Sequence, residues 1–221
     1  MLQSENRFSG ISLTVEFAAG GRETGVQLSD PRHLDILYIS AILLNMSWKR
    51  LDRRTLVNTK FLKVYEDKVE LPNGNIMDDY TVVEKPSFSM IIALDNDGNL
   101  ITIDEYKYAV DKIIHTLPAG HINEGEEPLE TAKRELVEET GYMGGEWENL
   151  GAYYDYPTKD LHKVYFIKAT GVTRTQETKF DPNEDLTPRV ISLNQLKEEI
   201  ARGEWRTNAV LSALVAAKLL S

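Results

Sequence analysis

The stretch from Gly120 to Tyr142 constrains this chain most, because it carries seven glutamates on a segment whose spacing predicts a single helix. Pro128 suits the first helical turn, where its missing N–H leaves no hydrogen bond unmade, and Gly141 is typical of the residue at which a helix ends. The expected buried stripe consists of apolar residues spaced three and four apart: Leu129, Ala132 and Leu136. We therefore expect an amphipathic helix between Pro128 and Gly141.

Three glutamates of this helix are spaced so that they share one face, namely Glu135, Glu138 and Glu139. Like charges in this arrangement repel one another and weaken an isolated helix, so we expect something to compensate them. A hard divalent cation, which prefers oxygen ligands, would do so. The alternative is an ordinary acidic helix face covered by solvent.

The composition excludes several classes of protein. The chain has 221 residues, enough for one domain with a sizeable core and a small appendage. Its 35 acidic and 25 basic residues give a formal net charge of −10 without a basic run, which argues against a nucleic-acid-binding surface. The absence of cysteine excludes disulfides, a thiolate nucleophile and sulfur-ligated zinc, and it fits a cytoplasmic protein.

Residues 1–45 are the least informative part of the chain, and we treat them as an N-terminal extension without an assigned role. The apolar run Leu34–Leu44 is too short for a helix that spans a bilayer, which needs about 20 residues, so no membrane segment is expected. It also lies too far into the chain for a signal peptide. Two alternatives stay open: the run is a buried strand or helix, or the native protein begins at Met46.

From Trp48 onward the pattern alternates between strands and helices. Residues 46–86 predict an antiparallel β segment, and residues 87–221 predict the main domain. Strands are expected at 59–71, 77–84, 87–94, 99–106, 147–156, 164–169 and 189–192, and further helices at 193–202, after the cap residue Ser192, and at 207–220. The last helix should bury Val210, Leu211, Leu214, Val215 and Leu219. This order indicates an α/β fold in which helices cover both faces of a mixed sheet.

The glutamate stretch resembles the Nudix box, which is a glycine, five residues, a glutamate, seven residues, and then Arg-Glu-aliphatic-any-Glu-Glu-any-Gly-apolar. The residues that fit it are Gly120, Glu126, Arg134, Glu135, Leu136, Glu138, Glu139 and Gly141, while Tyr142 stands where the family usually has an aliphatic residue. The resemblance implies a Nudix-type α/β/α sandwich. It also implies metal-dependent hydrolysis of a nucleoside diphosphate linked to another group, X, by attack of water on phosphorus.

The resemblance also assigns roles to particular residues. It implies that Glu135 and Glu139 are the principal ligands of two or more Mg²⁺ or Mn²⁺ ions, that Glu138 is a further ligand or a support, and that Ala119 contributes its carbonyl. Arg134 stays protonated, so we expect it to orient the carboxylates through bidentate hydrogen bonds rather than act as a base. The remaining box residues are expected to be structural: Gly120, Glu126 and Gly141.

Features outside the box resemble the ADP-ribose pyrophosphatases. The sequence Leu117–Gly120 matches their L-P-A-G entry, Pro157 lies sixteen residues after Gly141 at their marker proline, and Asn183–Leu186 resembles their late acidic loop. Within that loop Glu184 is the expected metal ligand or general base, with Asp181 and Asp185 as alternatives. We expect the substrate to contact Tyr106, Lys107 and Pro157. The favoured reaction is cleavage of ADP-ribose to AMP and ribose 5-phosphate.

The chain also departs from this subfamily. Glu105-Tyr106-Lys107 replaces the usual Gln-Tyr-Arg, and His115-Thr116 replaces a Trp-Glu pair that precedes L-P-A-G. These changes leave the identity of X open, so GDP-mannose and NADH stay as alternative substrates. A non-catalytic module that senses such a nucleotide stays as an alternative function. The resemblance further implies a homodimer in which the segment before Ser87 crosses to the partner subunit.

Overall fold

The computed structural model describes residues 47–178 and 185–220. The chain divides into two compact units, and the larger one, Lys49–Glu70 with Gly74–Ser221, contains every helix and strand named below. The expectations for residues 1–45, for Met46 and for the late acids Asp181 and Glu184 fall outside the described residues. Within the described part of the chain, no helix is long and apolar enough to span a membrane.

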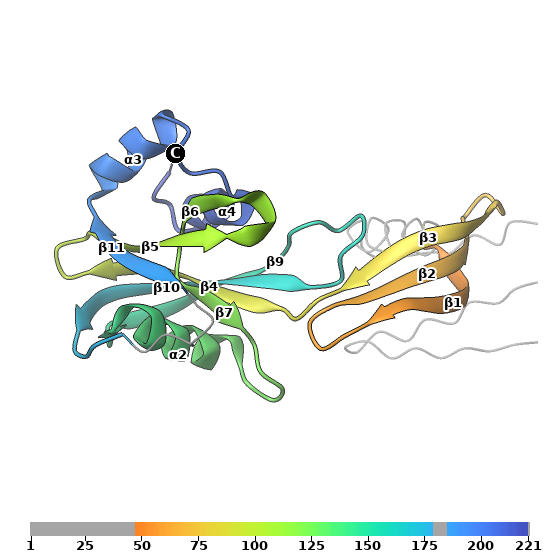
Figure 1. The fold of residues 1–221 in the computed structure, drawn as a ribbon, viewed down its shortest axis with the longest axis horizontal. Coiled ribbons are helices and arrows are strands. Elements are labelled where there is room, and N and C mark those ends of the chain that lie inside the picture. Colours follow the sequence, from red (N-terminus) through yellow and green to blue (C-terminus); the bar gives the residue numbers. More distant parts are fainter. Residues whose placement is uncertain (1–46, 179–184, 221) are drawn as a thin grey trace, which may run out of the picture. The chain divides into compact units, whose positions relative to one another are not determined.

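The first sheet consists of three antiparallel strands in the order β1-β2-β3: β1 Lys49–Asn58, β2 Lys63–Glu70 and β3 Ile76–Glu84 (Figure 1). The expected strand at 59–71 begins only at Lys63, because Thr59 and Leu62 close a turn in which the Leu62 N–H donates to the Thr59 hydroxyl over 3.0 Å. Within this sheet Arg53 donates to both carboxylate oxygens of Asp67 over 2.7 Å, and these bonds lower the Asp67 pKa.

The second sheet is mixed, as the sequence predicts. Its main path is β11-β5-β4-β10-β8, with β6 beside β5, β7 beside β4 and β9 beside β10. Only the β4–β10 pair is parallel among the paired strands described. The strands are β4 Phe88–Asp95, β5 Leu100–Lys107, β6 Lys112–Thr116, β7 Ala119–His121, β8 Tyr142–Met143, β9 Glu146–Tyr154, β10 Lys163–Arg174 and β11 Leu186–Ile191.

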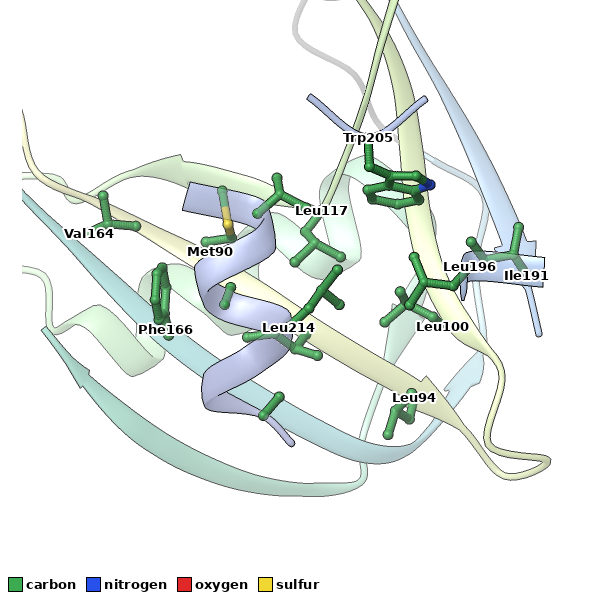
Figure 2. Close-up of a cluster of buried hydrophobic side chains, with 14 residues drawn as sticks. Met90, Leu94, Leu100, Leu117, Val164, Phe166, Ile191, Leu196, Trp205 and Leu214 are labelled. Carbon is green, nitrogen blue, oxygen red and sulfur yellow. The ribbon is translucent and has the colours of Figure 1, made fainter. Parts of the chain in front are cut away.

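Helices cover both faces of this sheet, which confirms the expected α/β/α arrangement. The helices are α2 Pro128–Thr140, α3 Leu193–Ala201 and α4 Asn208–Ala216. Alternate residues of a strand point to opposite faces. Ile92 of β4 therefore packs with Phe166 and Leu214 in the cluster drawn in Figure 2, whereas Ile91 packs with Leu136 of α2 in a separate cluster.

Several element boundaries differ from the expectation. Helix α4 ends at Ala216, and Val215, which was expected to be buried, is 58% exposed. Strand β10 continues past residue 169, where the expected strand ended, as far as Arg174, because Thr173 and Arg174 pair with β8. The predicted cap of α3 is confirmed: the Ser192 hydroxyl accepts from the Gln195 N–H over 3.1 Å.

Candidate active site

Helix α2 lies against the short strand β7, and this contact positions the first candidate ligand. Glu139 is only 6% exposed, and its Oε2 accepts a hydrogen bond from the Ala119 N–H over 3.1 Å. Strand β7 is itself held by β4, where Ala119 pairs with Met90. The Ser89 hydroxyl donates to the Pro128 carbonyl over 2.7 Å and so fastens the start of α2 to the same strand. A carboxylate on a rigid helix therefore faces a rigid backbone segment.

Glu135 reaches the same backbone segment one helical turn earlier. A Cβ placed on Gly120 would lie 1.8 Å from Oε1 and 1.9 Å from Cδ of Glu135. The carboxylate therefore occupies the space that any larger residue would need at position 120. Glu135 and Glu139 thus bring two carboxylates to the adjoining residues Ala119 and Gly120.

Arg134 connects three of the box glutamates. Its Nε and Nη2 donate to the two oxygens of Glu126, each over 3.0 Å, and its Nη1 donates to Glu135 over 2.7 Å and to Glu138 over 3.1 Å. The bidentate bond expected for this arginine is therefore made with Glu126, while Glu135 and Glu138 each receive one hydrogen bond. The hydrogen bond to Glu126, together with the hydrogen bonds to Glu135 and Glu138 and the charge of Glu135, raises the Arg134 pKa above its ordinary value.

The Arg134 hydrogen bonds also lower the pKa of Glu126, to about 2. Because the unfolded pKa of glutamate is about 4.3, this pair stabilises the fold fully above that pH and progressively less as the pH falls toward 2. We expect Glu126→Gln to lower the free energy of unfolding at pH 6, and the difference from wild type to shrink between about pH 4.5 and pH 2. Urea unfolding across this range measures it.

The matched control for that series is Glu124→Gln, on the same loop. Glu124 is exposed and makes no hydrogen bond or ion pair with another described residue, so its replacement removes a charge without removing a contact. A difference between wild type and Glu126→Gln that stays constant down to pH 2 would contradict the assigned role of the Arg134–Glu126 pair.

Gly141 ends α2 and lets a second segment pass close by. Its φ is 73°, in the left-handed region, and its N–H donates to the Val137 carbonyl. Its own carbonyl accepts from the Thr175 N–H over 3.0 Å. A Cβ at this position would lie 2.1 Å from the Gln176 carbonyl oxygen. Glycine is therefore needed here both for the backbone angle and for space.

Gly141→Ala should consequently destabilise the protein by about 3 kcal/mol, from left-handed strain together with a steric clash. Gly203→Ala is the control, because Gly203 has a φ of 72° but no atom within 4 Å of the added Cβ. That variant should lose only about 1–2 kcal/mol. Chemical unfolding of both proteins measures the difference, and equal losses would show that the approach of Gln176 does not matter.

A cavity of about 920 Å³ adjoins the candidate ligands, which is in the range of small-molecule sites. The predicted site residues that line it are Ala119, Gly120, Arg134, Glu135, Glu139 and Lys107. Glu138, whose side chain is 44% exposed, does not line it, and neither do Tyr106 or Pro157. The Tyr106 hydroxyl instead donates to Asp111 over 2.8 Å. Substrate contact by Tyr106 and Pro157 stays a prediction.

Other residues line this cavity that sequence reasoning did not select. Lys60 and Phe61 come from the turn between β1 and β2, Asp155 follows β9, and Arg206 precedes α4. The Phe61 ring stacks on His121, with centroids 6.1 Å apart. These residues belong to no motif and meet only through the fold, so no local signal in the sequence could have identified them.

The donor set fits a hard divalent cation. Carboxylate and carbonyl oxygens are the ligands that Mg²⁺ and Mn²⁺ prefer, and Glu135, Glu139 and the Ala119 backbone offer them together. No group of three acidic, histidine or cysteine side chains forms a complete cluster among the described residues. Arg134 donates hydrogen bonds to Glu135 and Glu138. Nudix hydrolases as a family generally use divalent metal ions.

Two family descriptions match the chain in succession. Residues 48–83 match the nucleoside diphosphate sugar hydrolase N-terminal domain, and residues 84–212 match the NUDIX domain. A solved structure described as an ADP compounds hydrolase has the same fold, with a TM-score of 0.68 and 21% sequence identity over 78% of this chain and 92% of that chain.

Curated proteins with similar sequences include two ADP-ribose pyrophosphatases. The ADP-ribose pyrophosphatase of Bacillus subtilis (strain 168) is 32% identical over 109 residues, which cover 49% of this chain and 58% of that protein. The methanol dehydrogenase activator of Bacillus methanolicus is 30% identical over 58% of this chain and 69% of its own length. The ADP-ribose pyrophosphatase of Mycobacterium tuberculosis is 26% identical over 76% of this chain and 82% of that protein. Four box residues, Gly120, Arg134, Glu135 and Glu139, line one cavity, and the chain belongs to the Nudix hydrolase family and is similar to its ADP-ribose pyrophosphatases.

Proposed function

We propose that this protein hydrolyses the pyrophosphate bond of ADP-ribose in the presence of Mg²⁺ or Mn²⁺, producing AMP and ribose 5-phosphate. The observation that carries the proposal is the convergence of the Glu135 and Glu139 carboxylates on Ala119 and Gly120 in the wall of the large cavity. The similarity to two ADP-ribose pyrophosphatases supports ADP-ribose as the substrate.

Each residue of the site has a separate role in the proposed hydrolysis. Glu135, Glu139 and the Ala119 carbonyl would hold two or more divalent ions, which when bound neutralise phosphoryl charge and lower the pKa of water. Arg134 keeps Glu135 and Glu138 oriented through its hydrogen bonds. Lys107 lines the cavity, and its Nζ lies 2.5 Å from Oε1 of Glu105. Its ammonium group offers a positive charge to the diphosphate. Glu184 is proposed as the further metal ligand or general base.

The assay for this function is incubation with ADP-ribose, GDP-mannose or NADH in Mg²⁺ or Mn²⁺, followed by chromatographic identification of the products. AMP and ribose 5-phosphate from ADP-ribose, formed faster than products from the other two, is the expected result. Preferred cleavage of GDP-mannose or NADH would reassign X. If no diphosphate is cleaved with either metal, the proposed hydrolysis is wrong.

The proposal includes a homodimer formed through residues 46–86, with residues 87–221 as the hydrolase domain. Support comes from large apolar side chains that the first sheet leaves exposed, among them Leu51, Leu56, Val57 and Ile76. Sedimentation at micromolar concentration should give the mass of two chains. A monomer at that concentration would exclude this assembly. The absence of cysteine is consistent with the cytoplasm, the proposed location.

A further inference from the structure

A smaller cavity of about 130 Å³ adjoins the large one. Asp155, Asn208 and Ala209 line both cavities, so the two spaces meet at these residues. The rest of the small cavity is formed by the end of β9, by β10 and by α4, through Tyr153, Tyr154, Val164, Phe166 and Ser212. It can therefore be reached by a ligand that is already bound along the large cavity.

The small cavity presents polar groups that the fold does not use. The side chains of Asp155, Asn208 and Ser212 make no hydrogen bond with another described residue. Asn208 and Ser212 lie four residues apart on α4 and so share one face of that helix. Together they offer a carboxylate that only accepts hydrogen bonds, and an amide and a hydroxyl that both donate and accept.

Aromatic side chains line the small cavity beside these polar groups. The Tyr153 ring stacks on Phe166 with centroids 4.5 Å apart, and its hydroxyl donates to the Leu150 carbonyl over 3.0 Å, so this ring is held in place. Tyr154 beside it is 58% exposed. Rigid aromatic rings offer apolar area at a low cost in conformational entropy.

Fewer cations line the small cavity than the large one, although the Lys163 Nζ lies over the ring of Tyr154, 5.5 Å from its centroid. No lysine or arginine lines the small cavity, whereas Lys60, Lys107, Arg134 and Arg206 line the large cavity. The Asp155 carboxylate would repel a phosphoryl group but accepts hydrogen bonds from neighbouring hydroxyls. An uncharged ring that carries several hydroxyl groups fits this combination of acceptor, amide and aromatic surface.

We propose that the small cavity binds the sugar ring of group X, through hydrogen bonds from its hydroxyls to Asp155 and with Asn208. This inference rests on the proposed function and adds to it the part of the chain that recognises X. Asp155 and Asn208 are then specificity-determining residues that contact substrate away from the reacting phosphorus.

The test compares two substrates that differ only in X: ADP-ribose, and the ADP methyl ester, in which a methyl group replaces the ribosyl group. Asp155→Ala and Asn208→Ala should each raise KM for ADP-ribose about tenfold with kcat changed less than twofold, because each removes a hydrogen bond made equally in ground and transition states. Neither variant should change KM for the methyl ester. Asn194→Ala, at an exposed position early in α3 that lines neither cavity, is the matched control.

The possible results separate this inference from the proposed function. If wild type cleaves ADP-ribose but both variants behave like Asn194→Ala, the sugar subsite is wrong and the proposed function stands. The same holds if both substrates lose affinity by the same factor. A wild-type protein that neither cleaves ADP-ribose nor binds it in calorimetry overturns both.

Discussion

Gly120→Ala is expected to remove most of the hydrolase activity while leaving the fold in place. The added Cβ would lie 1.8 Å from Oε1 of Glu135, so the carboxylate must rotate away from the Ala119–Gly120 backbone. Displacing a catalytic group by about 1 Å costs on the order of 100-fold in rate. The obstacle is the end of a flexible side chain, and Gly120 has no positive φ, so the free energy of unfolding should change little.

Gly144→Ala serves as the control, because it should introduce backbone strain without a steric clash. Gly144 has a φ of 79°, but nothing lies within 4 Å of its added Cβ. This variant should lose about 1–2 kcal/mol of stability from left-handed strain and keep its rate of ADP-ribose hydrolysis. Steady-state kinetics and urea unfolding of both variants measure the two effects. A Gly120→Ala enzyme with full kcat would show that the position of the Glu135 carboxylate against Gly120 is not needed.

The sequence alone was enough to predict those helices and strands whose signals lie within a few neighbouring residues. Helix α2 has a proline in its first turn, a glycine after its last residue and an apolar stripe, and each signal acts within a few residues. The buried strand β4 was predicted for a similar reason, because a short continuous apolar run between turn residues is typical of a strand that is covered on both faces. The box spacing then placed Glu135 and Glu139 on one helix.

The elements that the sequence did not predict depend on distant partners. Half of the residues of strand β1 are charged and nearly all are exposed, and only its pairing with β2 makes it a strand. Strand β7 has three residues and exists because Ala119–His121 pairs with β4. Val215 fits the apolar period of α4 but is 58% exposed among the described residues. Tertiary contacts override propensity in such segments.

The same limit applies to the candidate site. Spacing within the box indicated that Arg134 would hold carboxylates, but not that Glu126 would receive both parallel hydrogen bonds, since that depends on how the loop before α2 folds back. Asp155 and Arg206 reach the large cavity from two separate connections between elements, and Asn208 reaches it from the first residue of α4. Loops commonly carry such contacts, and their convergence is a property of the whole fold.

Glu139→Gln is expected to lower kcat/KM by about 1,000-fold, comparable to the loss of one strong electrostatic contribution to a transition state. Glutamine is the same size, and its carbonyl oxygen can still accept the hydrogen bond from the Ala119 N–H that Glu139 accepts at 3.1 Å. The backbone around the site should therefore keep its position. What disappears is a negative charge on a side chain that is only 6% exposed, where a cation is the expected partner.

A metal titration distinguishes lost ligation from lost structure. Because a cation that binds only the folded state stabilises it, millimolar Mg²⁺ or Mn²⁺ should raise the Tm of wild type. The shift should be much smaller in Glu139→Gln, whereas without metal this variant should be at least as stable as wild type, since it no longer buries a charge. Glu130→Gln is the control, because that exposed side chain lies on the same helix, is not a box residue and does not line the cavity. A Glu139→Gln protein with the wild-type metal shift would remove Glu139 from the metal site, whatever its activity.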